Sequence, residues 1–176
     1  MIKISKIETP LGEMVAGATR DGICLLEFSD RENLPAEYDE ISKLLGTTIK
    51  HGSNLHIWSL RKQLKEYFRG KRKKFTVKLV TPGSEFQQTV WKELRNIPYG
   101  ETISYHEQAA ALDNKGATRA VGHANATNRI AIVIPCHRVI GADGALVGYG
   151  GGLARKRWLL NHERKHSGKA VELDLF

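Results

Sequence analysis

Cysteine is scarce in this sequence, with only Cys24 and Cys136 among 176 residues. The two form neither a CxxC pair nor a disulfide framework, which favours a reducing compartment and predicts a cytoplasmic protein whose cysteine chemistry belongs to a lone thiol. Long apolar runs are also missing, so we expect no membrane-spanning helix and no membrane partner. The first residues, Met1–Lys6, alternate apolar and polar side chains, which is not typical of a secretory signal.

Acidic residues are outnumbered by basic ones, 19 Asp and Glu against 27 Lys and Arg, for a formal net charge of +8. Residues 61–78 hold nine Lys or Arg and a single acid, Glu66. An excess of positive charge favours an anionic partner such as nucleic acid. The same stretch is equally compatible with a solvated helix face that runs into a polar turn. With 41% hydrophobic residues the chain can bury a core, which excludes a disordered or collagen-like protein.

Proline and glycine divide the chain near Thr81-Pro82-Gly83, which predicts a first domain at residues 1–80 and a second at 81–176. Three short runs of the first domain are rich in Ile, Val and Leu and predict an antiparallel meander: Ile2–Glu8, Glu13–Ala18 and Ile23–Phe28. Apolar residues at three- and four-residue steps after Asn54 predict a helix that ends at Gly70, and Phe75–Val80 is expected to return as a strand.

The second domain has a mainly helical pattern. A helix capped by Ser84 should end before Pro98, and Ser104 should cap a second helix. A turn at residues 113–116 then leads into a further helix, Ala117–Ala126, and this spacing fits a helix-turn-helix. The last helix is rich in Ala and Gly, so it could approach a partner closely, with Arg119 and His123 projecting. A small-residue helix buried inside the domain is an equal alternative.

Cys136 follows a continuous apolar run, residues 130–134, which predicts a buried strand that delivers a thiol. The neighbouring His137 and Arg138 could supply the positive charge that makes a cysteine nucleophilic. Adjacent strand residues point in opposite directions, so His137 can reach the sulfur only through a turn at Pro135 or through a water. An inert core cysteine remains an equal alternative. Cys24 has no cationic neighbour, and we interpret it as a core residue.

Several ordered motifs resemble those of the O6-alkylguanine-DNA alkyltransferases, and of the bacterial constitutive type in particular. Residues 134–140, 148–153 and 158–163 resemble the active-site signature of that family, and residues 100–105 and 117–122 resemble its helix-turn-helix. The resemblance implies an α+β fold: a small strand-rich α+β domain, then a mostly helical domain with a helix-turn-helix and a short strand leading to the active-site cysteine. Gly150 departs from the serine of some members, which removes a hydroxyl near the alkylated oxygen.

The resemblance also implies roles for individual residues. Cys136 would attack the alkyl carbon, His137 would take the thiol proton through a water, and Glu163 would orient the imidazole. The phenol of Tyr105 would donate a proton to the leaving guanine. Implied DNA contacts are Tyr105, Ala117, Thr118, Arg119, Ala120 and Gly122, with Arg119 filling the stack after the nucleotide is flipped from the minor-groove side. The implied substrate pocket is formed by Asn128, Val139, Tyr149, Gly150, Gly151 and Gly152.

The implied function is direct reversal of DNA damage. A methyl or other alkyl group would move irreversibly from O6 of guanine in double-stranded DNA to Cys136, once per molecule, with O4 of thymine open as a second target. No cofactor is implied, and no metal, because the zinc ligands of some eukaryotic members have no counterpart here. We expect a monomer, and cooperative binding to DNA stays open. The alternatives are a non-catalytic sensor of alkylguanine, which commonly carries tryptophan at the cysteine position, and a cysteine hydrolase, which would need an oxyanion hole.

Overall fold

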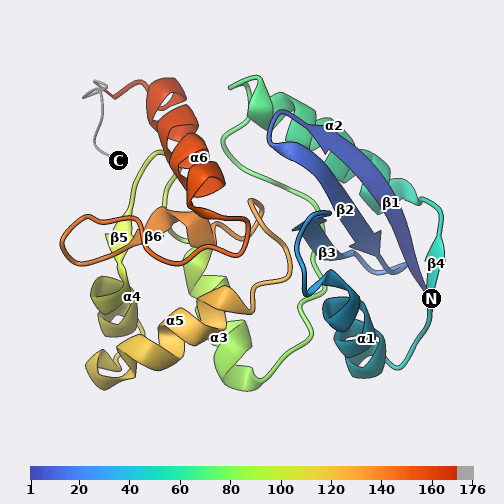
Figure 1. Ribbon diagram of the computed structural model, residues 1–176, viewed down its shortest axis with the longest axis horizontal. Helices are drawn as coiled ribbons and strands as arrows, with labels where there is room; N and C mark the ends of the chain where they lie inside the picture. The colour runs from blue at the N-terminus through green and yellow to red at the C-terminus, as the bar shows by residue number, and fades with distance from the viewer. Residues whose placement is uncertain (170–176) are drawn as a thin grey trace. The chain divides into compact units, whose positions relative to one another are not determined.

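The computed structural model describes residues 1–169 and divides into two compact units, Met1–Gly83 and a second that begins at Ser84. The first unit is a four-stranded sheet with two helices, and the second is mainly helical (Figure 1). The predicted α+β fold class is confirmed.

The sheet of the first unit has the order β3-β2-β1-β4. Its strands are β1 (Ile2–Thr9), β2 (Gly12–Ala18), β3 (Ile23–Phe28) and β4 (Ile49–His51). The three predicted runs pair antiparallel, as expected, and β4 adds to β1 in parallel. Thr9 pairs with Gly12 across the first turn, where Gly12 has a φ of 113°, a backbone conformation that favours glycine.

Two helices, α1 (Leu34–Leu45) and α2 (Leu55–Phe68), complete this unit. The side chain of Asn54 caps α2 by accepting from Ile57 N, and Figure 1 shows α2 lying along β1 and β2. The core that α1 covers includes fully buried Cys24, as its sequence context indicated. The expected strand at Phe75–Val80 is wrong: only an isolated bridge between Leu79 and Ile23 forms there.

The second unit begins with α3 (Glu85–Leu94), followed by β5 (Ile103–Ser104), α4 (Tyr105–Ala111), the 3-10 turn η1 (Lys115–Ala117) and α5 (Thr118–Ala126). The 3-10 turn η2 (Cys136–Arg138), β6 (Val139–Ile140) and α6 (Leu153–His166) follow. Ser84 and Ser104 both form reciprocal capping boxes, which explains why α3 and α4 begin where they do.

Helices α4 and α5 form the predicted helix-turn-helix and pack on α3 (Figure 1). Their shared core consists of Val90, Ala109, Val121 and Ala124. The buried amides of Gln108 and Asn125 also bind each other reciprocally, at 2.9 and 2.7 Å, and so tie α4 to α5. This pair satisfies two polar groups that would otherwise be costly to bury, and it fixes the angle between the helices.

The strand expected just before the cysteine is not there. Residues 130–134 are buried, but they form a turn rather than a strand. The short strand of this region, β6, instead follows the cysteine and pairs in parallel with β5, which precedes α4. Because Ile103 pairs with Val139 and Ser104 with Ile140, this two-residue ladder brings the start of α4 next to the cysteine turn.

Candidate active site

Cys136 lies at the start of a sharp turn. Pro135 has φ −83° and ψ 62°, and Cys136 N donates to Ile134 O at 2.8 Å, which is the geometry of an inverse γ-turn. The chain then continues as the 3-10 turn η2, which leaves Cys136 partly exposed while His137 and Arg138 are buried. A turn at Pro135 was one of the two routes by which His137 could reach the sulfur, and the structure contains that turn.

A second tight turn precedes the first. Ile132 has a φ of 71°, and Val133 N donates to Ala131 O at 2.8 Å across it. A positive φ is rare for a β-branched residue, so the backbone stores strain four residues before the cysteine. The surrounding core holds this conformation in place, because Ile132 is fully packed inside it.

Asn128 connects the end of α5 to the sulfur. Its side-chain Nδ2 donates to Ile134 O at 2.9 Å and to Cys136 Sγ at 3.3 Å, and its Oδ1 accepts from Ile130 N at 3.0 Å. The amide therefore spans the whole turn and places an N–H directly against the sulfur. Such a donor favours a thiolate over a thiol, because it stabilises negative charge on the acceptor.

A buried ion network lies behind the cysteine. Glu163 Oε1 accepts from His137 Nε2 at 2.8 Å, and Arg138 binds both carboxylate oxygens, from Nε and Nη2, at 2.9 Å each. Arg138 Nη1 also donates to Ile97 O at 2.7 Å. Because the carboxylate can only accept, His137 Nε2 carries a proton, and Nδ1 of the neutral ring is left as the basic nitrogen. That Nδ1 is buried and has no partner among residues 1–169.

The network sets the charge state of its members. Burial lowers the pKa of His137, with Arg138 and Lys156 acting in the same direction and Glu163 against them, so the ring is neutral at neutral pH. Burial alone would raise the pKa of Glu163, but the charges and hydrogen bonds of His137 and Arg138 outweigh it and hold that pKa well below its ordinary value. The site thus contains a neutral imidazole aligned by an ionised carboxylate, which is the arrangement of a general base.

Tyr105 is the first residue of α4. Its ring lies close to Gly122 of α5, and its hydroxyl donates to Val147 O at 3.1 Å. Burial, together with the charge of Cys136, raises the pKa of Tyr105, so the phenol keeps its proton and can donate it. A side chain at Gly148 would approach this hydroxyl, since a Cβ there would lie 3.4 Å from it.

Lys156 is a part of the site that sequence reasoning missed. It is a fully buried lysine on α6, and its Nζ donates to Val139 O at 2.6 Å, Val147 O at 2.9 Å and Gly148 O at 3.1 Å. Burial lowers the pKa of Lys156 to about 8, with the charge of Cys136 acting in the opposite direction. The lysine thus fastens the loop after residue 145 to the strand that follows the cysteine.

The remaining predicted residues lie at the end of η1, on α5, in β6 and on the glycine-rich loop. Arg119 and Ala120 are exposed on α5, and Ala117, Thr118 and Gly122 are partly exposed. Val121, Ala124 and Asn125 form its buried side, so α5 is not a fully buried small-residue helix. On the loop, Gly150 and Gly152 are exposed, whereas Tyr149 and Gly151 are partly covered. Gly152 begins α6 with a φ of 92°, and Val139 is fully buried beneath the loop.

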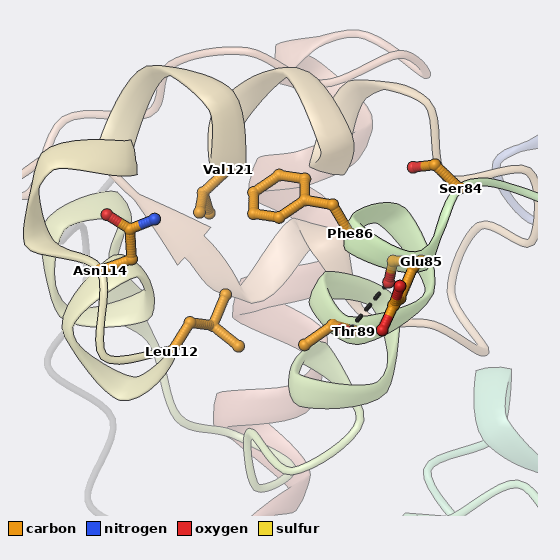
Figure 2. Close-up of a pocket in the computed structure, with 7 residues that line it drawn as sticks. All are labelled: Ser84, Glu85, Phe86, Thr89, Leu112, Asn114 and Val121. Atoms are coloured by element: carbon orange, nitrogen blue, oxygen red, sulfur yellow. Dashed lines mark hydrogen bonds between the residues drawn. The ribbon is translucent and has the colours of Figure 1, made fainter.

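The second unit also has a groove on the helix-turn-helix side, lined by residues of α3, of α5 and of the segment that follows α4. The groove has a volume of about 510 Å³. Figure 2 shows its lining residues, which are Ser84, Glu85, Phe86, Thr89, Leu112, Asn114 and Val121. The groove contains none of the predicted site residues, so it is not the place of the cysteine chemistry. Within residues 1–169, no three His, Cys, Asp or Glu side chains are grouped to hold a metal ion. No helix of that part of the chain is long and apolar enough to cross a membrane.

The fold and the site together define a class of protein, in which a helix-turn-helix domain carries a partly exposed cysteine next to a buried His-Glu-Arg network. Two family models match nearly the whole chain. Residues 2–81 match the 6-O-methylguanine DNA methyltransferase, ribonuclease-like domain, and residues 85–165 match the DNA binding domain of the same name. The chain belongs to the 6-O-methylguanine DNA methyltransferase family.

Individual relatives agree with this assignment. The chain is 55% identical over 159 residues to a methylated-DNA--protein-cysteine methyltransferase of Methanosarcina acetivorans, covering 89% of this chain and 94% of the relative. It is 44% identical to the constitutive enzyme of Bacillus subtilis over 158 residues, covering 89% and 92%. Among solved structures, that of Mycobacterium tuberculosis OGT in complex with DNA matches with a TM-score of 0.77 at 40% identity, over 94% of this chain and 93% of that one.

Proposed function

We propose that this protein repairs DNA by moving an alkyl group from O6 of guanine in duplex DNA to Cys136. The observation that carries the proposal is the setting of Cys136: the residue is partly exposed, its sulfur accepts an N–H from Asn128, and the next residue in the chain, His137, is a buried imidazole aligned by Glu163. A soft thiolate is suited to attack at an alkyl carbon, and a relay of this kind supplies the thiolate.

The proposed reaction balances without a cofactor. The Cys136 thiol loses its proton to His137 Nδ1 through a water, the thiolate forms an S–C bond to the alkyl carbon, and the C–O6 bond breaks. The electron pair of that bond stays on guanine, which takes a proton from the Tyr105 phenol. The proton held by His137 then restores the phenol. The net product is unmodified guanine and an S-alkyl cysteine.

A thioether is a poor leaving group at neutral pH, so each molecule should react once. A titration tests this: the moles of O6-methylguanine removed from a duplex should rise with protein and stop at one per mole. A cysteine hydrolase, by contrast, would turn over. A non-catalytic lesion sensor does not fit a chain with a cysteine and a complete relay at this position. Duplex DNA with O6-alkylguanine is the proposed substrate, O4-alkylthymine stays open, and a monomeric state remains a prediction.

The protonation of His137 should set the pH dependence of alkyl transfer. Because burial lowers the pKa of His137 below its ordinary value of 6.5, the imidazole should become protonated only as the pH falls below that value. The rate of alkyl transfer from free O6-benzylguanine to Cys136 should therefore decline with a midpoint below pH 6.5, as the base is protonated. Single-turnover rates on both sides of that pH measure it. A decline already centred at or above pH 6.5 would contradict a buried neutral His137.

The second prediction concerns Arg119, which is exposed on α5. The target nucleotide must leave the stack, at a cost of a few kcal/mol, and the arginine is proposed to fill the space it vacates. Arg119→Ala should slow transfer from duplex DNA by about tenfold or more, and should leave transfer from the free base unchanged. Lys115→Ala, which removes a nearby exposed cation from η1, serves as the control for charge alone. Equal slowing with both substrates would assign Arg119 to the chemistry or the fold instead.

A further inference from the structure

Positive charge is concentrated in one stretch of the first unit, residues 61–78. The chain has 27 Lys and Arg and 19 Asp and Glu, and this stretch holds nine of the basic residues but only one of the acidic ones. The rest of the chain therefore has eighteen basic and eighteen acidic residues, whose charges cancel. The net charge of +8 is therefore the charge of this stretch alone. The alkyl-transfer site uses none of it, because every residue of that site lies in the second unit.

Helix α2 turns its apolar side chains inward and its cations outward. Its buried residues include Ile57, Leu60, Leu64 and Tyr67. On the opposite face Lys62, Lys65 and Arg69 are exposed, at spacings of three and four residues that align them along the helix. Trp58, which is 60% exposed, begins the same stripe. From Trp58 to Arg69 the stripe is about 16 Å long at 1.5 Å per residue, or about five base-pair steps of DNA at 3.4 Å each.

The charge continues past the end of the helix. Gly70 has a φ of 72°, and the segment that follows exposes Lys71, Lys73, Lys74 and Lys78. We call these four lysines, together with Lys62, Lys65 and Arg69, the basic ridge.

The acid of the stretch does not neutralise the ridge. Glu66 Oε2 is held by Arg72 Nε at 2.6 Å, so its charge is paired with an arginine outside the ridge. Arg61 is also used inside the unit, where Nη2 donates to Lys6 O at 3.1 Å. Within residues 1–169, no carboxylate lies within ion-pairing distance of Lys62, Lys65 or Arg69.

Folding does not account for this arrangement. Cations in the last turn of a helix are favourable, but that covers only Lys65 and its neighbours and not the segment beyond Gly70. Like charges three and four residues apart on a helix repel one another, and a concentrated excess of one sign opposes the compact state. An anionic partner on the ridge would remove both penalties.

We propose that the basic ridge binds the phosphate backbone of duplex DNA, as a second and sequence-independent contact of this chain with DNA. The choice of duplex DNA rests on the proposed function, since the second unit acts on the same polymer. A row of cations matches a row of phosphates, each of which releases a counterion when it is neutralised. A membrane surface is a poorer match, because the apolar face that a helix would insert into lipid is already buried in the core.

The experiment compares two triple variants of the full chain with the same change in net charge. The ridge variant carries Lys62→Gln, Lys65→Gln and Arg69→Gln. The control variant carries Lys43→Gln, Lys50→Gln and Arg20→Gln, three exposed cations of the same unit that lie outside the ridge. Binding to an undamaged duplex is measured by fluorescence anisotropy at several NaCl concentrations around 0.1 M, and transfer from free O6-benzylguanine reports on the integrity of the site.

The slope of log K against log salt should fall in magnitude by about 2 to 3 in the ridge variant, or about 0.9 for each phosphate that is no longer neutralised, with affinity at least about tenfold weaker. The control variant should keep a slope near that of the parent, and both should keep free-base transfer. Equal slopes in the two variants would overturn the proposal. The proposal would also be overturned if the ridge variant kept the slope of the parent on duplex DNA but no longer bound RNA or anionic phospholipid vesicles.

A second ridge variant guards against an effect on helix folding. This variant carries three substitutions beyond the end of α2: Lys71→Gln, Lys73→Gln and Lys74→Gln. It should lower the magnitude of the salt slope as the first ridge variant does. The parent's own behaviour separates this proposal from the proposed function. If the parent transfers no alkyl group while the ridge variant still lowers the slope, the repair function fails and the DNA-binding surface stands. If the parent transfers the alkyl group and the ridge and control variants have equal salt slopes, the repair function stands and the proposed DNA-binding surface fails.

Discussion

Replacing Glu163 with glutamine should slow alkyl transfer by about a hundredfold to ten-thousandfold, which is the range that general-base catalysis contributes, because His137 can no longer be held and charged as the base without its carboxylate. The amide has nearly the same shape as the carboxylate, but it removes the charge that fixes the His137 tautomer and pairs with Arg138. Arg138 would then be a buried cation without its counterion, which should cost about 3 to 5 kcal/mol of stability. Single-turnover transfer from the free base and urea unfolding measure the two effects.

A double variant separates chemistry from folding in this network. Adding Arg138→Met to Glu163→Gln removes the unpaired cation and should restore part of the stability, because a buried charge without a partner costs more than a buried apolar side chain. Transfer should stay slow, since His137 still lacks its carboxylate. Glu101→Gln, which breaks the exposed pair with Lys169, is the matched control and should change neither property. Transfer that recovers along with stability would show that Glu163 acts only on the fold.

Replacing Lys156 with methionine should have the next largest effect. Methionine fills a similar volume but leaves the carbonyls of Val139, Val147 and Gly148 without their common donor. At about 1 to 3 kcal/mol for each unsatisfied buried group, with relief from solvent where the carbonyl is only partly buried, we expect a destabilisation of about 2 to 4 kcal/mol. The loop that bears Tyr149 and Gly150 should then loosen, and transfer should slow at least about tenfold.

The matched control for Lys156→Met is Lys165→Met, a lysine on the exposed side of the same helix, α6. A second measurement distinguishes a positioning role from a loss of stability. The single-turnover rate is measured as a function of the concentration of free O6-benzylguanine, at a temperature where circular dichroism shows that the variant is folded. A loosened loop should weaken binding of the base more than it slows the step at bound substrate. If a folded Lys156→Met binds and reacts like the parent, the lysine has no positioning role.

Much of the fold could be predicted because the chain marks its own element boundaries. Asn54, Ser84 and Ser104 are strong N-cap residues, and each begins a helix in the structure where the apolar spacing placed one. Helix α1 was not predicted, although its boundaries are marked just as clearly. Pro35 lies in its first turn, and Gly46 lies just past its end in the left-handed conformation.

Other features could not be obtained from the sequence. Residues 130–134 are apolar because they are buried, and burial does not distinguish a strand from the strained turn centred on Ile132. The contact between Asn128 and the sulfur depends on the same turn. Lys156 was missed because lysine is almost never fully buried unless it is paired, and its partners are backbone carbonyls, which no side-chain pattern in the sequence marks.

The central claim, that the alkyl group ends on Cys136, is tested most directly by mass spectrometry of the intact protein after reaction with an O6-methylguanine duplex, followed by peptide mapping. The account predicts a mass increase of one methyl group in place of one hydrogen, on the peptide that contains Cys136, in an amount equal to the guanine repaired. Cys24 is fully buried and its pKa is raised to about 12 by burial, so it should stay unmodified. Repair with no mass change, more than one repair per molecule, or a methyl group on Cys24 would contradict the account.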